Sequence, residues 1–287
     1  MIKLKYLLQF IFIFILFLIF KLIGIKLSRL LSGKILTFIG PLFRSNKIPF
    51  SNLSYAYPEL NVAERKKIID GMWFNYGKIL SEYMFIKDFR KEKFFNENII
   101  IENFQEIIKI KNDKRPVVFI SGHFNNFELM ALCIEKSGVN LAAIYRPLNN
   151  IFLNPIMEKI RKNYICKNQI KKGISGTKEL LKKFKMGTSI ALMIDQRVSE
   201  GIPSNFFNKK ALTTTIPAQF VKKFNAEIVP VYIERLKDDK FKIKFHDSLK
   251  FHNQDTLEKI TLELNNIIEK MILKNPDQWI WTHNRWK

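Results

Sequence analysis

The sequence predicts an α/β fold: a single domain with a mostly parallel central sheet flanked by helices, preceded by an N-terminal membrane-anchor helix. Short runs of consecutive apolar residues, typical of buried strands, alternate with longer segments of helical periodicity. This alternation is characteristic of parallel sheets. No linker rich in Pro and Gly interrupts the body of the chain. The anchor is predicted because residues 6–20 are almost entirely Leu, Ile and Phe.

The first apolar run is followed by Lys21 and a second, shorter apolar stretch. A membrane-spanning helix needs about 20 apolar residues, and a lysine that reaches the interface lengthens the usable segment. A secretory signal would need an Ala-x-Ala-like cleavage site, and none follows the run. We therefore expect residues 1–26 to be a retained anchor and residues 27–287 to form the domain. A spanning and an interfacial position of the helix both stay open.

Positive charge is concentrated after the anchor and is high throughout. The chain has 48 Lys and Arg against 26 Asp and Glu, a net charge of +22. Such a balance indicates an anionic partner, for which nucleic acid, anionic lipid and an acidic carrier protein are candidates, although an AT-rich genome would also inflate Lys. Most of the 26 Phe lie inside apolar runs, which favours core and lipid contacts over nucleic acid. Basic residues beside an anchor favour the cytoplasmic face.

The elements of the domain are predicted in order along the chain. Asn61 and Glu64 form a capping box at the start of a helix that runs to about Phe85. The later helices are expected at residues 126–136, 151–161, 177–186, 215–224 and 256–273, with Gly187 ending the third. The strands are expected at residues 116–121, 141–145, 189–195, 227–234 and 241–245. The last strand alternates apolar and basic residues, as an edge strand would.

The two cysteines, Cys133 and Cys166, do not point to a metal site. They form no CxxC pair, and no Cys/His cluster has zinc spacing. Free thiols fit a reducing compartment, and small core residues are the simpler interpretation of both. We expect no metal site and no cofactor.

Three chemically useful side chains follow predicted strands. His123 comes just after the first, Arg146 just after the second, and Asp195 ends the third. Sites in open α/β sheets form at the carboxyl ends of the strands. The sequence therefore predicts a site at this edge of the sheet.

His123 and Glu128 are five residues apart, and on a regular helix they would be separated by about 140°. They meet only if His123 lies on the turn after the strand and Glu128 in the first turn of the helix, with Asn125 or Asn126 as the N-cap. The carboxylate would then hold one imidazole nitrogen and leave the other to act as a base. This suits deprotonation of a hydroxyl that attacks a thioester. A capping Glu and a core His would also explain the pair.

A serine hydrolase is excluded by the same stretch, because Ser121 is not in a Gly-x-Ser-x-Gly turn. The stretch from His123 to Glu128 instead resembles the signature of the late acyltransferases of lipid A biosynthesis, the lauroyl/myristoyl transferase family. The usual form there is closer to His-x-Gly-Asn-Trp-Glu, and this chain has Asn125 for the Gly and Phe127 for the Trp. Further similar blocks lie in order along the chain, two before His123 at residues 52–59 and 73–77 and three after Glu128 at residues 145–150, 195–213 and 276–287, with Asn208 in place of a Gly.

The resemblance implies an O-acyltransferase that moves an acyl chain from an acyl-acyl carrier protein to a hydroxyl of a lipid A precursor of the Kdo-bearing lipid IVA type. It implies His123 as general base and Glu128 as its orienting partner, on the cytoplasmic face of a bacterial inner membrane. The residues expected to bind substrate are Asn126, Arg146, Arg161, Asp195, Gln196 and Arg197. His283, in the terminal block, is expected to be structural.

Two alternatives stay open. The acceptor is another membrane lipid, a lysophospholipid or a glycolipid, or the chain is a non-catalytic lipid-binding membrane protein of the same fold. Glu128 disfavours the glycerol-phosphate acyltransferases, which carry His-x4-Asp.

Overall fold

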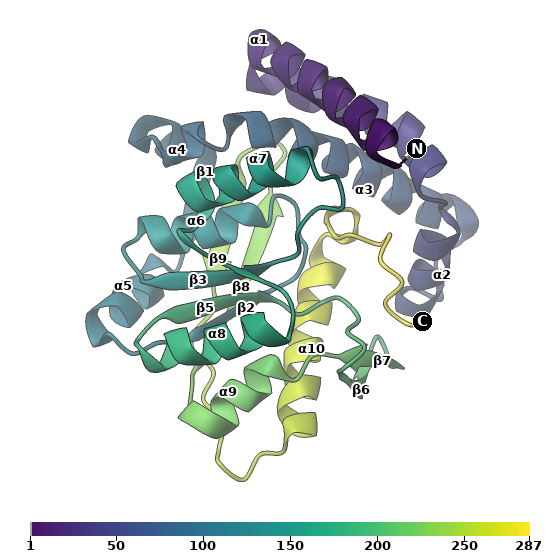
Figure 1. The fold of residues 1–287 in the computed structure, drawn as a ribbon. Helices are drawn as coiled ribbons and strands as arrows, with labels where there is room; N and C mark the ends of the chain where they lie inside the picture. Colours follow the sequence, from purple (N-terminus) through teal and green to yellow (C-terminus); the bar gives the residue numbers. More distant parts are fainter. Residues whose placement is uncertain (1) are drawn as a thin grey trace.

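The computed structural model describes residues 2–287, and the predicted α/β class is confirmed (Figure 1). A seven-stranded sheet has the order β1-β9-β8-β2-β5-β3-β4 and is parallel except for the β8–β9 pair. Its strands are β1 (Ile99–Glu102), β2 (Val118–Ser121), β3 (Leu141–Tyr145), β4 (Asn168–Lys171), β5 (Ser189–Met193), β8 (Ile228–Arg235) and β9 (Phe241–Phe245). A separate hairpin pairs β6 (Ile202–Phe206) with β7 (Lys209–Thr213).

Helices cover both faces of the sheet, with α6 and α7 on one side and α8 and α9 on the other (Figure 1). The helices are α1 (Ile2–Phe43), α2 (Lys47–Ala56), α3 (Val62–Glu82), α4 (Glu92–Asn98), α5 (Phe104–Asp113), α6 (Glu128–Lys136), α7 (Leu153–Ile160), α8 (Ile174–Lys185), α9 (Ile216–Phe224) and α10 (Leu257–Lys274). The predicted capping box is confirmed, because the Glu64 N–H donates to Asn61 Oδ1 over 3.0 Å and the Asn61 N–H donates to Glu64 Oε2 over 2.8 Å.

The prediction that residues 241–245 form an edge strand was wrong. β9 lies inside the sheet, between β1 and β8. Its alternating lysines have partners on the neighbouring strands: Lys242 Nζ lies 3.1 Å from a carboxylate oxygen of Glu234, and Lys244 pairs with Glu102. The polar face of the strand is therefore a ladder of cross-strand ion pairs, which gives the same pattern as a solvent-exposed edge.

The two strands at the edges of the sheet were not predicted. The two edge strands, β1 and β4, are four residues each and are partly polar. The β6–β7 hairpin was missed because its turn uses Phe207 and Asn208 at positive φ rather than a glycine. Short strands give too few residues for a period-2 pattern to stand out.

Helix α1 is long and apolar enough to cross a membrane, by length and composition. It has two halves, because Gly24 has a non-helical backbone with φ 78°. The later half packs closely on α3, where a Cβ on Gly77 would lie 2.1 Å from the carbonyl oxygen of Ser32. Residues 25–43 are thus part of the packed body.

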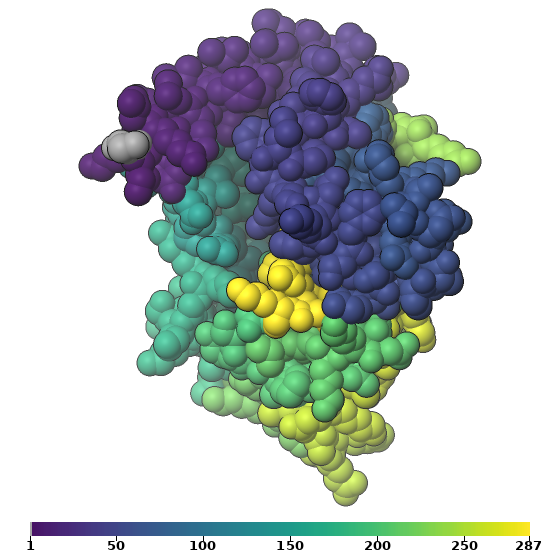
Figure 2. Space-filling model, turned by 90° about the vertical axis from the view of Figure 1, so that its right-hand side faces the viewer, coloured from purple at the N-terminus to yellow at the C-terminus, as the bar shows by residue number. Residues whose placement is uncertain are grey.

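The first half of α1 rests on the loop after β3, and the N-terminal segment lies along the top of the molecule (Figure 2). Asn150 Nδ2 donates to the Tyr6 carbonyl over 2.9 Å, and the rings of Phe10 and Phe152 are 6.1 Å apart. Most of its remaining surface is apolar, although Lys3, Lys5, Gln9 and Lys21 are also exposed. The exposed large side chains of this half are Ile2, Leu4, Leu7, Leu8, Ile11, Phe12, Phe14, Ile15, Leu18, Ile19 and Leu22.

Candidate active site

His123 and Asp195 meet at the carboxyl edge of the sheet. β2 ends at Ser121 and pairs in parallel with β5, which ends at Met193, so the residues after both strands emerge side by side. The imidazole Nδ1 of His123 lies 2.8 Å from Asp195 Oδ1, and the backbone N–H of His123 donates to Oδ2 over 2.8 Å. The side chain of Asp195 is 1% exposed and that of His123 is 19% exposed. The ring therefore reaches the surface while its partner is buried.

Asp195 is held as a carboxylate. Burial opposes its ionisation, but attraction to His123 and hydrogen bonds from His123 and from the indole of Trp279 outweigh burial and lower its pKa to about 2. The Trp279 Nε1–H donates to Oδ2 over 2.7 Å. A carboxylate at Nδ1 assigns the proton of neutral imidazole to that nitrogen, which leaves the Nε2 lone pair free to accept a proton.

The expected hydrogen bond between Glu128 and the imidazole was wrong. Glu128 Oε1 accepts from the Arg161 Nε–H over 2.8 Å and from the Tyr83 hydroxyl over 2.8 Å. Arg161 Nη2 is 2.7 Å from the same oxygen. The Glu128 side chain is mostly buried, so its charge requires a close cation, and Arg161 supplies one. Among residues 2–287, the carboxylate bonded to His123 is that of Asp195.

The placement of the pair on the chain was nevertheless predicted correctly. His123 lies on the turn after β2, and Glu128 is the first residue of α6. The expected N-cap was wrong, since α6 begins after Phe127 and the asparagine side chains are used elsewhere. Phe127, which stands where the resembled signature has Trp, packs its ring against the imidazole with centroids 4.8 Å apart.

Asn125 and Asn126 are both buried and both bonded to distant segments. Asn125 has φ 43°, a left-handed conformation that asparagine tolerates, and its backbone N–H donates to the Gln278 carbonyl over 2.9 Å. Asn126 Nδ2 donates to Glu82 Oε2 over 3.0 Å. The substrate-binding role predicted for Asn126 stays a prediction, and its amide nitrogen is occupied by protein.

The remaining candidates lie along the same edge. Arg146 is exposed immediately after β3, and the Arg161 guanidinium lies 5.7 Å from the ring centre of the preceding Tyr145. Gln196 and Arg197 are partly buried after Asp195. The Arg197 backbone N–H donates to His283 Nε2 over 3.0 Å.

His283 belongs to the surroundings of the site. Burial lowers its pKa to about 4, with attraction to Asp195 working against this and repulsion from His123 adding to it. The ring is therefore neutral near pH 7 and accepts a hydrogen bond. Its expected structural role stays a prediction.

Three residues that contact the candidate site were not predicted: Glu82, Tyr83 and Trp279. Glu82 is the last residue of α3, and Tyr83 directly follows it. Trp279 lies in the terminal block of residues 276–287, whose resemblance marked it as a candidate but did not indicate that it bonds Asp195. Each acts across at least 44 residues of sequence, a range at which local periodicity carries no information.

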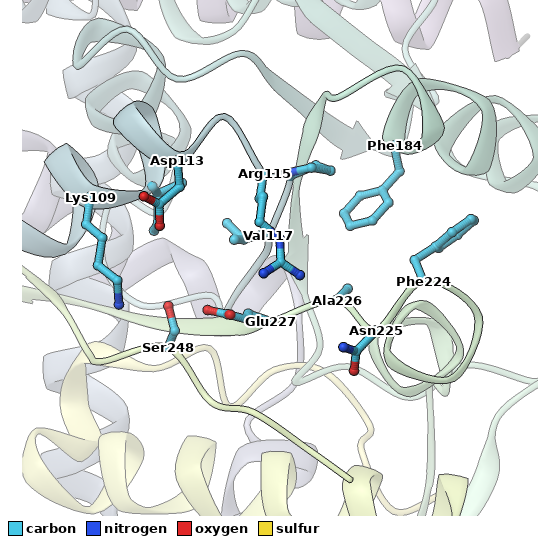
Figure 3. Close-up of a pocket in the computed structure, with 12 residues that line it drawn as sticks. Lys109, Asp113, Arg115, Val117, Phe184, Phe224, Asn225, Ala226, Glu227 and Ser248 are labelled. Atoms are coloured by element: carbon cyan, nitrogen blue, oxygen red, sulfur yellow. The ribbon is translucent and has the colours of Figure 1, made fainter. Parts of the chain in front are cut away.

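A cavity of about 80 Å³ opens at the opposite end of the sheet (Figure 3). It is lined by residues that precede β2 and β8, including Arg115, Val117 and Glu227. Its lining contains neither His123 nor Asp195. The cavity is therefore separate from the candidate site. In residues 2–287, no three His, Cys, Asp or Glu side chains are grouped as a metal site.

Comparison with known proteins gives consistent similarities. Residues 1–287 match the family model described as bacterial lipid A biosynthesis acyltransferase. The chain is 24% identical over 255 residues to the lipid A biosynthesis palmitoleoyltransferase of Escherichia coli (strain K12), covering 85% of this chain and 79% of that protein. It is 25% identical over 256 residues to the lipid A biosynthesis lauroyltransferase of the same organism, with the same coverage. A lipid A biosynthesis acyltransferase of Shigella flexneri is 24% identical over 255 residues, with 85% and 79% coverage.

Proposed function

The chain belongs to the bacterial lipid A biosynthesis acyltransferase family, and on that premise we propose that it moves a fatty acyl chain from an acyl-acyl carrier protein thioester to a hydroxyl of a lipid A precursor of the Kdo-bearing lipid IVA type. The names of its relatives, a palmitoleoyltransferase and a lauroyltransferase, support a fatty acyl donor. The net charge of +22 suits a phosphorylated acceptor, an acidic carrier protein and an anionic membrane surface.

The observation that carries this proposal is the His123–Asp195 pair at the carboxyl edge of the sheet. Asp195 holds Nδ1–H and orients the ring, so that Nε2 takes the proton from the acceptor hydroxyl. The alkoxide attacks the thioester carbonyl and forms a tetrahedral intermediate. The C–S bond then breaks, and the thiolate of the carrier leaves with the proton that His123 received. In these steps the proton taken from the acceptor hydroxyl is returned to the leaving thiolate, and no cofactor is needed.

Glu128 has a second role in the proposal. It holds the Arg161 guanidinium by two N–H groups, which leaves the other N–H donors of Arg161 to bind a phosphate of the acceptor. Arg146, Gln196 and Arg197 follow neighbouring strands at the same edge and are proposed to bind the acceptor as well. Glu128 thus supports catalysis through Arg161, and Asp195 takes the orienting role that the sequence assigned to Glu128.

We place the protein at a bacterial inner membrane with its body on the cytoplasmic face. The apolar first half of α1, with its exposed Leu, Ile and Phe side chains, supports membrane contact. The basic residues that follow it support the cytoplasmic side.

The test is acyl transfer by purified full-length protein in detergent micelles. Acyl-acyl carrier protein and Kdo-bearing lipid IVA are supplied, and products are weighed by mass spectrometry. A product heavier by one acyl group, formed by the wild type and lost in His123→Ala, is expected. Transfer only to a lysophospholipid or a glycolipid would replace the acceptor in the proposal. Binding of lipid without transfer to any acceptor would instead identify a non-catalytic lipid-binding protein.

A further inference from the structure

A fully buried carboxylate joins three distant segments beneath the candidate site. Glu82, at the end of α3, is 0% exposed. Its Oε1 accepts from Arg29 Nε of α1 and from Arg235 Nη1 at the end of β8, each over 2.6 Å. Its Oε2 accepts from Arg235 Nη2 over 3.1 Å and from Asn126 Nδ2 over 3.0 Å.

The charges of this cluster depend on one another. Burial opposes ionisation of Glu82, but Arg235 and Arg29 outweigh it and lower its pKa. Two buried guanidinium groups face a single carboxylate, and removal of one partner from a buried pair leaves an uncompensated charge. The contacts of Glu82 are therefore fixed in geometry, since among residues 2–287 neither Arg29 nor Arg235 has another carboxylate as close as that of Glu82. The nearest other carboxylate to Arg235 is Asp239, at 3.9 Å.

Asn126 connects this cluster to the turn that carries His123 and Glu128. Within residues 2–287, no side chain caps the N-terminus of α6. The conformation of the turn is therefore set by tertiary contacts. Asn125 is bonded to Gln278 on one side, and Asn126 is bonded to Glu82 on the other. The turn is also attached through His123 to Asp195 and through Glu128 to Arg161, and the attachment through Asn126 leads by way of Glu82 to α1.

We propose that Arg29, Glu82 and Asn126 are positioning residues that couple the docking of the later half of α1 to the geometry of the His123 turn. None of them needs to touch substrate. The membrane-associated helix and the catalytic turn then share one rigid connection, so that displacement of α1 displaces the base. The effect on catalysis rests on the proposed function, whereas the structural coupling between α1 and the His123 turn does not depend on it.

The test compares Arg29→Met and Asn126→Ala with Lys21→Met in full-length protein. Lys21 is on the same helix and forms an exposed ion pair with Asp88, so it is a matched control. We expect Arg29→Met and Asn126→Ala each to lower kcat by about tenfold or more, with KM for the lipid acceptor changed by less than about twofold, because misplacement of a base acts on the chemical step. Hydrogen–deuterium exchange of residues 121–130 should rise in both variants. Lys21→Met should leave both measurements unchanged.

Several outcomes separate this idea from its rivals. A raised KM with unchanged kcat and unchanged exchange in Asn126→Ala would show that Asn126 binds substrate and would overturn the proposal. Full kcat in folded Arg29→Met, with only a lower melting temperature, would show a merely structural arginine. Partial recovery of kcat by Arg29→Lys supports positioning. Asn126→Ala leaves both ion pairs intact and decides the matter if Arg29→Met does not fold. If the wild type transfers no acyl group, the proposed function fails, while the exchange measurement still decides the coupling.

Discussion

At the scale of single residues, the site contains two carboxylates with different partners. Asp195 is bonded to the imidazole of His123, and Glu128 is bonded to the guanidinium of Arg161. In the mechanism we propose, the two acids therefore affect different properties of the reaction. Asp195 would set the tautomer and orientation of the base, and Glu128 would set the position of a cation.

Replacement of Asp195 tests the first role. We expect Asp195→Asn to lower kcat by about a hundredfold or more, because an amide stabilises the wrong tautomer and does not favour the imidazolium that forms. The pH dependence of the rate should change as well, since a charge next to the base is removed. Glu128→Ala should lower turnover by a similar factor without the same change in the pH profile. Asp70→Asn, in a surface ion pair with Lys66, is the control. Identical pH profiles for wild type and Asp195→Asn would contradict the assignment.

His283 provides a prediction on stability. Its pKa is about 4 in the folded protein against about 6.5 in an unfolded chain. The neutral ring therefore favours the folded state fully above pH 6.5, and this contribution is lost as pH falls through 4. Chemical denaturation should show a loss of roughly 1–2 kcal/mol from this group between pH 7 and pH 4, because solvent screening at a partly exposed ring reduces the full effect of the lowered pKa. His283→Gln should show a correspondingly smaller loss over that interval, and an equal loss in both proteins would refute the assignment.

At the scale of elements, the contact between α1 and α3 depends on a glycine. Gly77 of α3 lies against the backbone of Ser32, and a Cβ added to Gly77 would lie 2.1 Å from the Ser32 carbonyl oxygen. A Gly→Ala change inside a helix normally stabilises the folded protein by about 1 kcal/mol. Here the added methyl would force two helix backbones apart, and overpacking costs about 1–3 kcal/mol.

Gly77→Ala should therefore destabilise the protein by about 1–3 kcal/mol, measured as a shift of the denaturation midpoint in detergent. The exposed Lys67 of the same helix, changed to Ala, serves as the control and should have almost no effect. An unchanged or higher midpoint for Gly77→Ala would mean that the two helices are not held this closely.

At the scale of the whole molecule, the sequence predicted the positions of elements better than their partners. Consecutive apolar runs located β2, β3 and β5, and the rule that parallel strands end together placed His123 and Asp195 on one edge. The sequence could not show that Asp195, rather than Glu128, is bonded to His123. Glu128 is close to His123 along the chain, whereas Asp195 is close only because β5 lies beside β2 in the sheet. The role of Glu82 could not be predicted, because the partners of a buried ion cluster are distant in sequence and produce no local periodicity.

The division of the chain between membrane and body gives the last prediction. Removal of residues 2–17 deletes eight exposed apolar side chains, Ile2 to Ile15, but keeps the buried Phe20 and the Arg29–Glu82 ion pair. This variant should lose about tenfold or more in binding to anionic vesicles, measured by sedimentation, and should melt within about 5 °C of the full chain. Removal of residues 2–43 takes away Arg29 and the surface that covers α3, so it should not fold. Unchanged vesicle binding after the shorter deletion would place the membrane contact elsewhere, and unfolding after it would show that the first half of α1 is part of the packed body.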